Sequence, residues 1–194
     1  MNQPLRDELL AMDAEDQRVR QELMDRDELG DGYHPRMEDV HKRNAARLKE
    51  IIAEHGWPSR ALVTEDGAFA AWRMAQHSIG DPQFQRLCLR LLEEAARRGD
   101  VSPQHPAYLL DRIRMYEGKP QIYGTQFMPN REGDTVPWEI EDPGHVDERR
   151  ATIGLGPLTE LVLAPDPSRR PPRENLERWF RGYEEWLQKT GWRK

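Results

Sequence analysis

The sequence of 194 residues contains a single cysteine, Cys88. One cysteine excludes an internal disulfide framework and a cluster of thiolate metal ligands, and it is typical of a reducing compartment. The sequence also lacks an apolar stretch near the N-terminus and any run of the roughly 18 apolar residues that a membrane-spanning helix needs. We therefore expect a soluble, cytoplasmic protein.

The sequence also lacks an excess of positive charge. The 29 lysine and arginine residues are outnumbered by 35 aspartate and glutamate residues, which gives a formal net charge of -6 and a pI near 5.6. This balance disfavours nucleic acid and anionic membranes as partners, and the short basic cluster at 169–173 does not reverse it. The partner that we expect is a small-molecule substrate, with no nucleic acid and no membrane.

Apolar residues recur at three- and four-residue steps along most of the chain, as in amphipathic helices. The pattern predicts helices over about 5–27, 37–54 and 65–78, and two more that are closed by Gly99 and Gly118. The only β structure expected is a short β-hairpin or ordered loop between Gly118 and Trp138. The predicted fold class is mainly α, with six to eight helices in a compact domain and an appended C-terminal helix.

Three segments are expected along the chain. Residues 1–163 form the helical core domain that carries a polar pocket, 164–173 form a proline- and arginine-rich linker, and 174–194 form a tryptophan-rich helix. The linker is expected because its prolines and charges have nothing to pack or pair with. The aromatic surface of the last helix must dock either on the domain or on a second copy of the chain, so a homo-oligomer through this helix is one of two expectations.

Two short polar residues interrupt the apolar stripes of the first two helices. Asp16 lies on the stripe of the first helix, where a buried unpaired charge is too costly. It therefore faces solvent at the edge of the stripe or turns inward toward a partner such as an arginine. Asn44 interrupts the second stripe, either as part of a buried polar layer with Asp16 or as a core amide that the backbone satisfies.

The candidate pocket centres on the stretch 102–126. Asp111 and Arg112 lie in the middle of an apolar helix and project about 100° apart, so we expect each to meet partners on different helices or on a ligand. The segment QIYGTQ that follows is dense in hydrogen-bonding side chains. The third helix ends at Gln76, His77 and Ser78, where the helix dipole favours a protonated imidazole, and His77 is either a structural cap or a functional group.

Common motifs for metal, phosphate and covalent chemistry are absent. The sequence has no HExxH, no paired CxxC, no GxGxxG or GxxxxGK loop and no GxSxG. We therefore expect no metal and no organic cofactor, although a site built from His77, Asp111 and a third residue stays open as a lesser alternative. The remaining chemistry is general acid–base catalysis without a metal ion.

The expected function is an enzyme that hydrolyses, eliminates or cyclises a small polar metabolite or specialised-metabolite intermediate. His77 would exchange a proton, Asp111 would orient it or act as the base, and Arg112 would hold a carboxylate or stabilise developing negative charge. The expected substrate-binding side chains are Gln76, Gln121, Tyr123, Gln126, Asp16 and Asn44. The alternative is a non-catalytic ligand-binding or protein-interaction module in which the same residues form a structural network.

Several short strings occur in an order and spacing that resembles a bacterial domain-of-unknown-function family. They are GWP at 56–58, QH at 76–77, DR at 111–112, QIYGTQ at 121–126, IED at 140–142 and VDERRATIGLGPL at 146–158. The resemblance covers about Leu5 to Leu163 and leaves the C-terminal helix unmatched. It implies a compact, mainly helical bacterial domain and brings no established activity.

Overall fold

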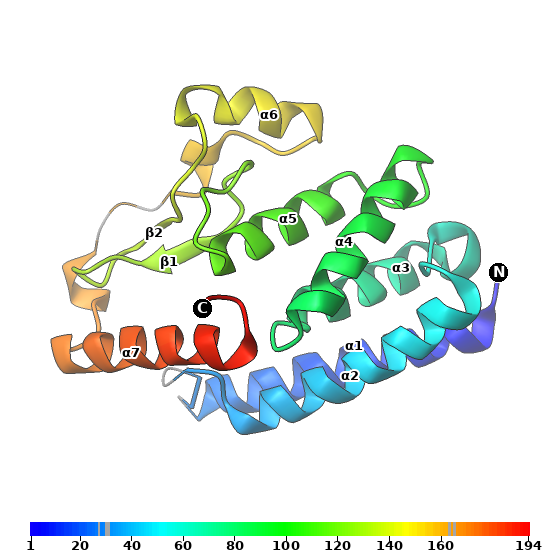
Figure 1. The fold of residues 1–194 in the computed structure, drawn as a ribbon, viewed down its shortest axis with the longest axis horizontal. Helices are drawn as coiled ribbons and strands as arrows, with labels where there is room; N and C mark the ends of the chain where they lie inside the picture. Colours follow the sequence, from blue (N-terminus) through cyan, green and yellow to red (C-terminus); the bar gives the residue numbers. More distant parts are fainter. Residues whose placement is uncertain (27, 30–31, 163, 165) are drawn as a thin grey trace. The chain divides into compact units, whose positions relative to one another are not determined.

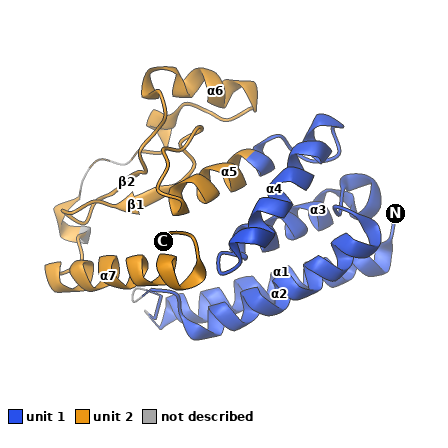
Figure 2. Ribbon diagram, in the orientation of Figure 1, with its two compact units in different colours: residues 1–106 blue, residues 107–194 orange. Residues whose placement is uncertain are grey.

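The computed structural model describes residues 1–26, 28–29, 32–162, 164 and 166–194, apart from the side chain of Arg169. Contacts divide the chain into two compact units, 1–106 and 107–194, which are described separately (Figure 2). The sequence places the boundary at 163–164 instead. Residue 163, the predicted end of the core domain, and Asp27, the predicted end of the first helix, lie outside the described residues.

The first unit is built from α1 (Gln3–Asp25), α2 (Pro35–His55), α3 (Arg60–His77) and α4 (Pro82–Arg97) (Figure 1). Polar side chains cap the starts of three of these helices, and Nδ1 of His34 accepts from the backbone N–H of Arg36 at the start of α2. The side chain of Asn2 accepts a hydrogen bond from the backbone N–H of Leu5, and Asp81 accepts one from Phe84 at 3.0 Å. Gly56 ends α2 with a φ of 73°, which glycine adopts without strain.

The alanine-rich helix α3 lies against α1, α2 and α4. Its residues Ala70, Ala71 and Ala75 are fully buried, and these small side chains allow close helix approach. The central position predicted for this helix is thus confirmed. The stripes of α1 and α2 supply larger core side chains, among which Leu9, Leu23, Leu48 and Ile51 are at most 1% exposed.

The regular part of α3 follows Thr64, close to the predicted start at residue 65, but the expected connector at 59–66 also contains a helical turn that begins at Arg60. Val63 and Thr64 interrupt that turn with non-helical backbone angles, and Thr64 has a φ of 63°. Arg6 donates from Nε to the Thr64 hydroxyl at 2.9 Å and to Asp66 at 3.0 Å. These contacts with α1 hold a conformation that a β-branched residue rarely adopts.

The second unit contains most of α5 (Gln104–Tyr116), the strands β1 (Phe127–Pro129) and β2 (Thr135–Pro137), α6 (Val146–Thr152) and α7 (Arg173–Thr190). The two strands pair antiparallel, with Met128 opposite Val136, which confirms the predicted hairpin. The seven α-helices of the described chain and this hairpin confirm the mainly α fold class. Short 3-10 turns occupy Pro143–His145, Leu158–Glu160 and Pro167–Arg169.

The segment before α7 is not a free linker. The guanidinium of Arg170 donates to both carboxylate oxygens of Asp134, at 2.9 and 2.7 Å, in the hairpin turn. Gly133 in the turn lies close to Pro171. A side chain at position 133 would place its Cβ only 3.0 Å from Cδ of Pro171. The expectation that these charges and prolines have nothing to pair with is wrong at Arg170 and Pro171.

The aromatic face of α7 docks within the second unit. The ring of Tyr116 lies 5.3 Å from Trp186 and 5.1 Å from Trp192, measured between centroids. Arg193 donates to the backbone carbonyls of Tyr116 at 2.9 Å and Met115 at 3.1 Å. Docking on the chain itself is therefore observed, and self-association through α7 stays a prediction. No helix of the described residues is long and apolar enough to cross a membrane.

Candidate functional site

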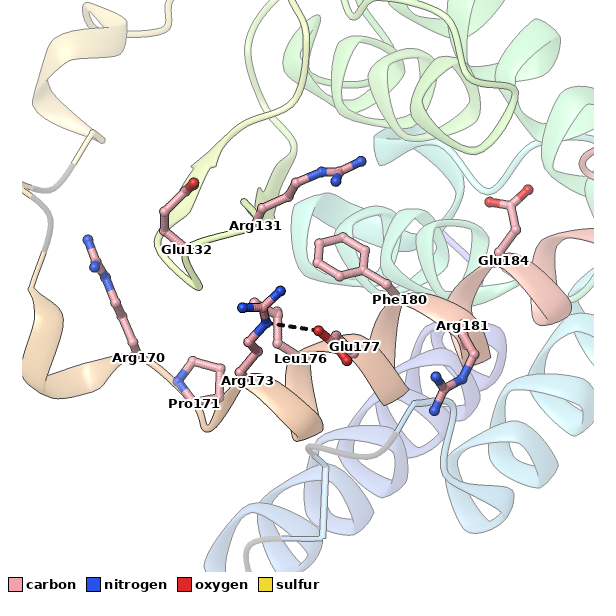
Figure 3. Close-up of a pocket in the computed structure, with 10 residues that line it drawn as sticks. All are labelled: Arg131, Glu132, Arg170, Pro171, Arg173, Leu176, Glu177, Phe180, Arg181 and Glu184. Atoms are coloured by element: carbon pink, nitrogen blue, oxygen red, sulfur yellow. Dashed lines mark hydrogen bonds and ion pairs between the residues drawn. The ribbon is translucent and has the colours of Figure 1, made fainter.

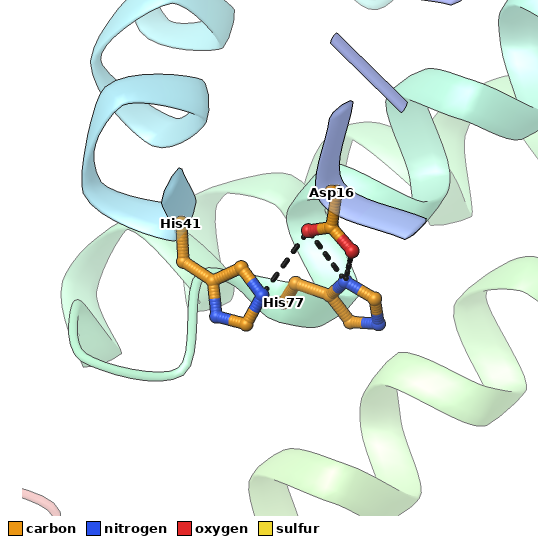
Figure 4. Close-up of side chains that lie close together, drawn as sticks. All are labelled: Asp16, His41 and His77. Atoms are coloured by element: carbon orange, nitrogen blue, oxygen red, sulfur yellow. Dashed lines mark hydrogen bonds and ion pairs between the residues drawn. The ribbon is translucent and has the colours of Figure 1, made fainter. Parts of the chain in front are cut away.

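Three helices of the first unit bring a carboxylate and two imidazoles together (Figure 4). Asp16 comes from the middle of α1, His41 from α2, and His77 from the last position of α3. Nδ1 of His77 lies 3.0 Å from each carboxylate oxygen of Asp16. Nε2 of His41 lies 3.1 Å from Oδ2 of the same residue. We call Asp16, His41 and His77 the Asp–His–His cluster.

Helix periodicity places these side chains inward. Asp16 lies three residues before the core residue Val19, and His41 lies four residues after Met37, so both occupy the buried stripe of their helix. Asp16 is 2% exposed, which confirms the inward alternative. Its partners are two histidines, whereas an arginine was the example that the sequence suggested.

The charge of Asp16 is stabilised by the two histidines. Burial alone would raise the pKa of Asp16, but the close polar contact with His41, the hydrogen bonds of His77 and the charge of both imidazoles outweigh it and hold this pKa well below its usual value. Gln17 adds a hydrogen bond from Nε2 to Oδ1 at 3.0 Å. Asp16 is therefore a buried anion with donors on both oxygens.

The pKa of Asp13, one turn earlier on α1, is shifted in the opposite direction. Burial raises its pKa, the positive charge of Arg73 opposes that shift, and the charge of Asp16 adds to it. The guanidinium of Arg73 lies 3.3 Å from the carboxylate of Asp13. Asp13 and Asp16 thus lie in different environments, and the histidines hold only the carboxyl group of Asp16 ionised.

A fourth group extends the cluster to a cleft. The hydroxyl of Tyr33 lies 2.7 Å from Nδ1 of His41, and the two rings stack with centroids 5.6 Å apart. Tyr33 and His41 line a cleft of about 250 Å³, together with Lys42, Lys49 and Ser78. A line of polar contacts therefore runs from the cleft through Tyr33 and His41 to the buried Asp16 and on to His77.

The two other predicted site residues of the first unit are buried amides. Gln76 is 3% exposed, and its backbone carbonyl accepts a hydrogen bond from Nε2 of Gln85 at 3.0 Å. Asn44 is 8% exposed, and its Nδ2 has no hydrogen-bond partner among the described residues. Burial of Asn44 fits both alternatives, the buried polar layer and the core amide, so the choice between them stays a prediction.

Asp111 holds the QIYGTQ segment of the second unit in place. Its Oδ1 accepts from the backbone N–H of Ile122 at 2.7 Å, and its Oδ2 accepts from the backbone N–H and the hydroxyl of Thr125 at 3.1 and 2.9 Å. The N–H of Tyr123 lies within 3.2 Å of both oxygens. Burial raises the pKa of Asp111, and these donors oppose that shift. The carboxylate therefore organises a loop.

The amides of the same segment close the loop. Nε2 of Gln121 donates to the backbone carbonyls of Gln126 at 3.0 Å and Trp138 at 2.9 Å, and Oε1 of Gln121 accepts from the N–H of Gln126 at 2.9 Å. The guanidinium of Arg150 donates to the carbonyl of Tyr123 at 2.7 Å. These contacts hold the QIYGTQ segment in place within the second unit.

Arg112 contacts different residues from Asp111, as expected for neighbouring helix positions whose side chains project about 100° apart. Burial raises the pKa of Tyr116, and the charge and hydrogen bond of Arg112 offset part of that increase. Arg112 thus lies beside the aromatic residues under α7. His77 and Asp111 belong to separately described units, so their pairing in one site stays a prediction.

The second unit also carries an open groove of about 950 Å³ along α7 and the hairpin turn (Figure 3). Phe180 and Leu176 line it together with arginines such as Arg131 and Arg181. Other charges there are paired, as in the 2.9 Å contact between Arg173 and Glu177. This groove is a candidate contact surface rather than a reaction centre.

Sequence reasoning missed His41 and Tyr33. His41 carries the same signal that identified Asp16 and Asn44, a polar residue on an apolar stripe, because it lies four residues after Met37 and three before Asn44. Tyr33 lies outside the helices, where no periodicity marks a residue as inward. Comparing the stripes of the first two helices position by position would have found His41.

Comparison with known proteins gives one match. The profile of a family of unknown function, DUF6624, matches residues 3–166. No curated protein and no solved structure matches the chain. The match ends before α7, as the predicted resemblance did.

Proposed function

We propose that this chain, which belongs to the DUF6624 family of unknown function, is an enzyme that acts on a small polar metabolite by general acid–base chemistry at the Asp–His–His cluster. The observation that carries the proposal is the line of contacts from Tyr33 in the cleft, through His41, to the ionised and buried Asp16. The proposed chemistry uses the side chains of the chain and no metal ion or organic cofactor.

The proposed proton path starts at the cleft. A proton leaves the substrate for the oxygen of Tyr33 while the hydroxyl proton of Tyr33 moves to Nδ1 of His41, 2.7 Å away. The resulting imidazolium is stabilised by the carboxylate of Asp16, which lies 3.1 Å from Nε2. The reverse transfer returns the proton to the product, as hydrolysis, elimination and cyclisation each require.

His77 has a positioning role in this proposal. Its Nδ1 lies 3.0 Å from both oxygens of Asp16 and fixes the carboxylate that supports His41. The side chain of His77 is 23% exposed, so it also offers a route for protons between the cluster and solvent. Gln76 and Asn44 are proposed to shape the buried surroundings of the cluster, since both are buried in the same unit.

The size of the cleft supports a small substrate. Its volume of about 250 Å³ is below the roughly 300–1,000 Å³ of sites for drug-sized ligands. The ammonium groups of Lys42 and Lys49 lie on its wall and are paired with Glu38 and Asp81 at 2.7 and 2.6 Å. A polar metabolite with an acidic proton fits this lining better than a large apolar compound.

The alternative is a non-catalytic ligand-binding or interaction module. It is favoured by the second unit, where Asp111, Gln121 and Arg150 are used to hold a loop. In that case the groove at Phe180 and Arg181 is the contact surface, and the Asp–His–His cluster only joins three helices.

A thermal-shift screen with small carboxylates, amines and amides, in the presence of EDTA, separates the two functions. Binding to the native state raises the unfolding temperature. We expect a compound that stabilises the wild type and loses its effect in Tyr33→Phe and His41→Gln. The matched control is His55→Gln, which changes a histidine of α2 that pairs with Glu54 instead. Compounds that stabilise all variants equally would favour the interaction module.

A further inference from the structure

We propose that Asp16, His41 and His77 form a binding site for one divalent transition-metal ion of the zinc or iron(II) class. The proposal goes beyond the proposed function, because metal binding needs no substrate and is measured without one. Metal-bound and metal-free states of the cluster are alternatives, since the ion would replace the contacts that Asp16 makes with the two imidazoles.

The donor set is of the kind that such ions take. One carboxylate oxygen and two imidazole nitrogens suit zinc and iron(II), and sites of this composition commonly leave coordination positions open for water or substrate. The donor atoms of Asp16, His41 and His77 all lie within 4.8 Å of one another. They come from three different helices, so no local sequence motif indicates this set of ligands.

The distances agree with shared coordination. Bonds of about 2.0–2.1 Å to zinc place neighbouring ligand atoms about 2.9–3.4 Å apart in octahedral or tetrahedral geometry. Oxygens of Asp16 lie 3.0 Å from Nδ1 of His77 and 3.1 Å from Nε2 of His41. The ring centroids of His41 and His77 are 5.0 Å apart, and the ligand atoms of all three residues lie within 4.8 Å of one another, so both imidazoles are close enough to share an ion with Asp16.

One of the three proposed ligand atoms, Nε2 of His41, lacks a well-formed hydrogen bond. Nε2 of His41 is fully buried, and it makes no hydrogen bond of acceptable angle within the described chain, although Oδ2 of Asp16 is 3.1 Å away. Burying a polar nitrogen without a good partner costs free energy. A metal ion between Nε2 and Oδ2 would satisfy both atoms.

Tyr33 and Gln17 make hydrogen bonds that orient the proposed ligands, as residues around metal sites commonly do. The hydroxyl of Tyr33 contacts the other ring nitrogen of His41 at 2.7 Å, which fixes the ring and leaves Nε2 for the ion when Nδ1 carries the proton. Gln17 donates to Oδ1 of Asp16 at 3.0 Å and leaves Oδ2 for the ion. His77 would bind through Nδ1 with its proton on Nε2. Its side chain, 23% exposed, leaves one side of the site open.

The test is calorimetric titration of the full chain, without a histidine tag and after EDTA treatment and dialysis, with Zn²⁺, and absorption spectroscopy with Co²⁺. We expect one ion per chain and visible Co²⁺ bands. Affinity should fall more than about 100-fold in His41→Gln and Asp16→Asn, because losing a side chain that binds the ion costs more than the about 10–100-fold lost with a residue that only supports a ligand. His55→Gln, on the same helix as His41, should bind as the wild type does.

Tyr33→Phe keeps the test valid if the ligand variants fail to fold. This change removes one oxygen, and it should weaken Zn²⁺ binding by about 10–100-fold, as loss of an outer-shell partner does. No binding to the wild type, or equal binding to the wild type, Tyr33→Phe and His41→Gln, would overturn the proposal. Either outcome leaves the substrate screen in EDTA unaffected, so failure of the metal site and failure of the proposed function are distinguishable.

Discussion

Nδ1 of His77 lies 3.0 Å from both carboxylate oxygens of Asp16, although the two residues are on α3 and α1. Together with His41, this contact ties three helices of the first unit at one buried point. A carboxylate that is 2% exposed is stable there because two imidazoles accompany it. The same contact therefore has consequences for stability and for chemistry.

Replacing Asp16 with asparagine should destabilise the first unit. The change removes the anion that His41 and His77 share, and loss of one partner from a buried ion pair costs about 3–5 kcal/mol. Urea unfolding at neutral pH measures this loss in the free energy of unfolding. Asp7→Asn, at an exposed position of the same helix, is the control and should leave the unfolding curve unchanged. Equal curves for wild type and Asp16→Asn would contradict the buried ion pair.

His105 should make stability depend on pH. Burial, with a further contribution from the charge of Arg60, lowers the pKa of His105 to about 4. Its ring stacks on Trp72 with centroids 4.6 Å apart. Because the unfolded histidine binds a proton near pH 6.5 and the folded one near 4, stability is complete above 6.5 and falls as the pH drops between these values.

The size of this effect follows from the shift. The difference in pKa corresponds to at most about 3 kcal/mol of unfolding free energy at the acidic end. Urea unfolding at pH 7 and pH 4.5 should show a smaller loss for His105→Gln than for the wild type, since carboxylates contribute equally to both. The same loss in both proteins would mean that His105 is protonated in the folded state.

Asp111→Ala should release the QIYGTQ loop. The backbone N–H groups of Ile122, Tyr123 and Thr125 lose their acceptor, and unsatisfied buried donors cost about 1–3 kcal/mol each. Hydrogen exchange at these amides should become at least about tenfold faster, which corresponds to 1.4 kcal/mol or more. Thr125→Val removes only the hydroxyl contact and should have a much smaller effect. Unchanged exchange in Asp111→Ala would remove the structural role assigned to Asp111.

The packing of α7 should contribute to stability. Leu187 is fully buried, so Leu187→Ala should cost about 2–5 kcal/mol, as such changes do in packed cores. Leu161→Ala is the control, because Leu161 is 46% exposed. Thermal unfolding followed by tryptophan fluorescence reports on Trp186 and Trp192, which lie beside Tyr116. If both variants unfold alike, α7 does not dock as described.

Much of the fold follows from the sequence because periodicity and caps are local signals. The stripe through Leu9 and Leu23 and the cap at Asp81 each predict their element directly. The break inside α3 does not follow, because Thr64 adopts its non-helical backbone angles beside Arg6, which is distant in sequence. The sequence at Arg170 predicts a linker for a similar reason, since its partner Asp134 is distant in the chain and no local pattern shows the pairing.

The site was predictable only in part. The stripe of α1 marked Asp16 as a residue that needs a partner, and the end of α3 marked His77, but no local spacing joins these positions to His41. Asp111 was expected to meet partners on other helices or on a ligand, and this is wrong for the partners that are observed, which lie in a loop. That these partners are backbone N–H groups of a loop has no sequence signature, because backbone donors are the same at every residue except proline.

The most direct test of the proposed function is a crystal structure of the protein soaked with the compound that gives the largest thermal shift. We expect the compound to occupy the cleft lined by Tyr33 and His41, with a polar atom within hydrogen-bond distance of the Tyr33 hydroxyl. Occupancy of the groove at Phe180 and Arg181 instead, with the cleft empty, would contradict it and would indicate a binding module centred on α7.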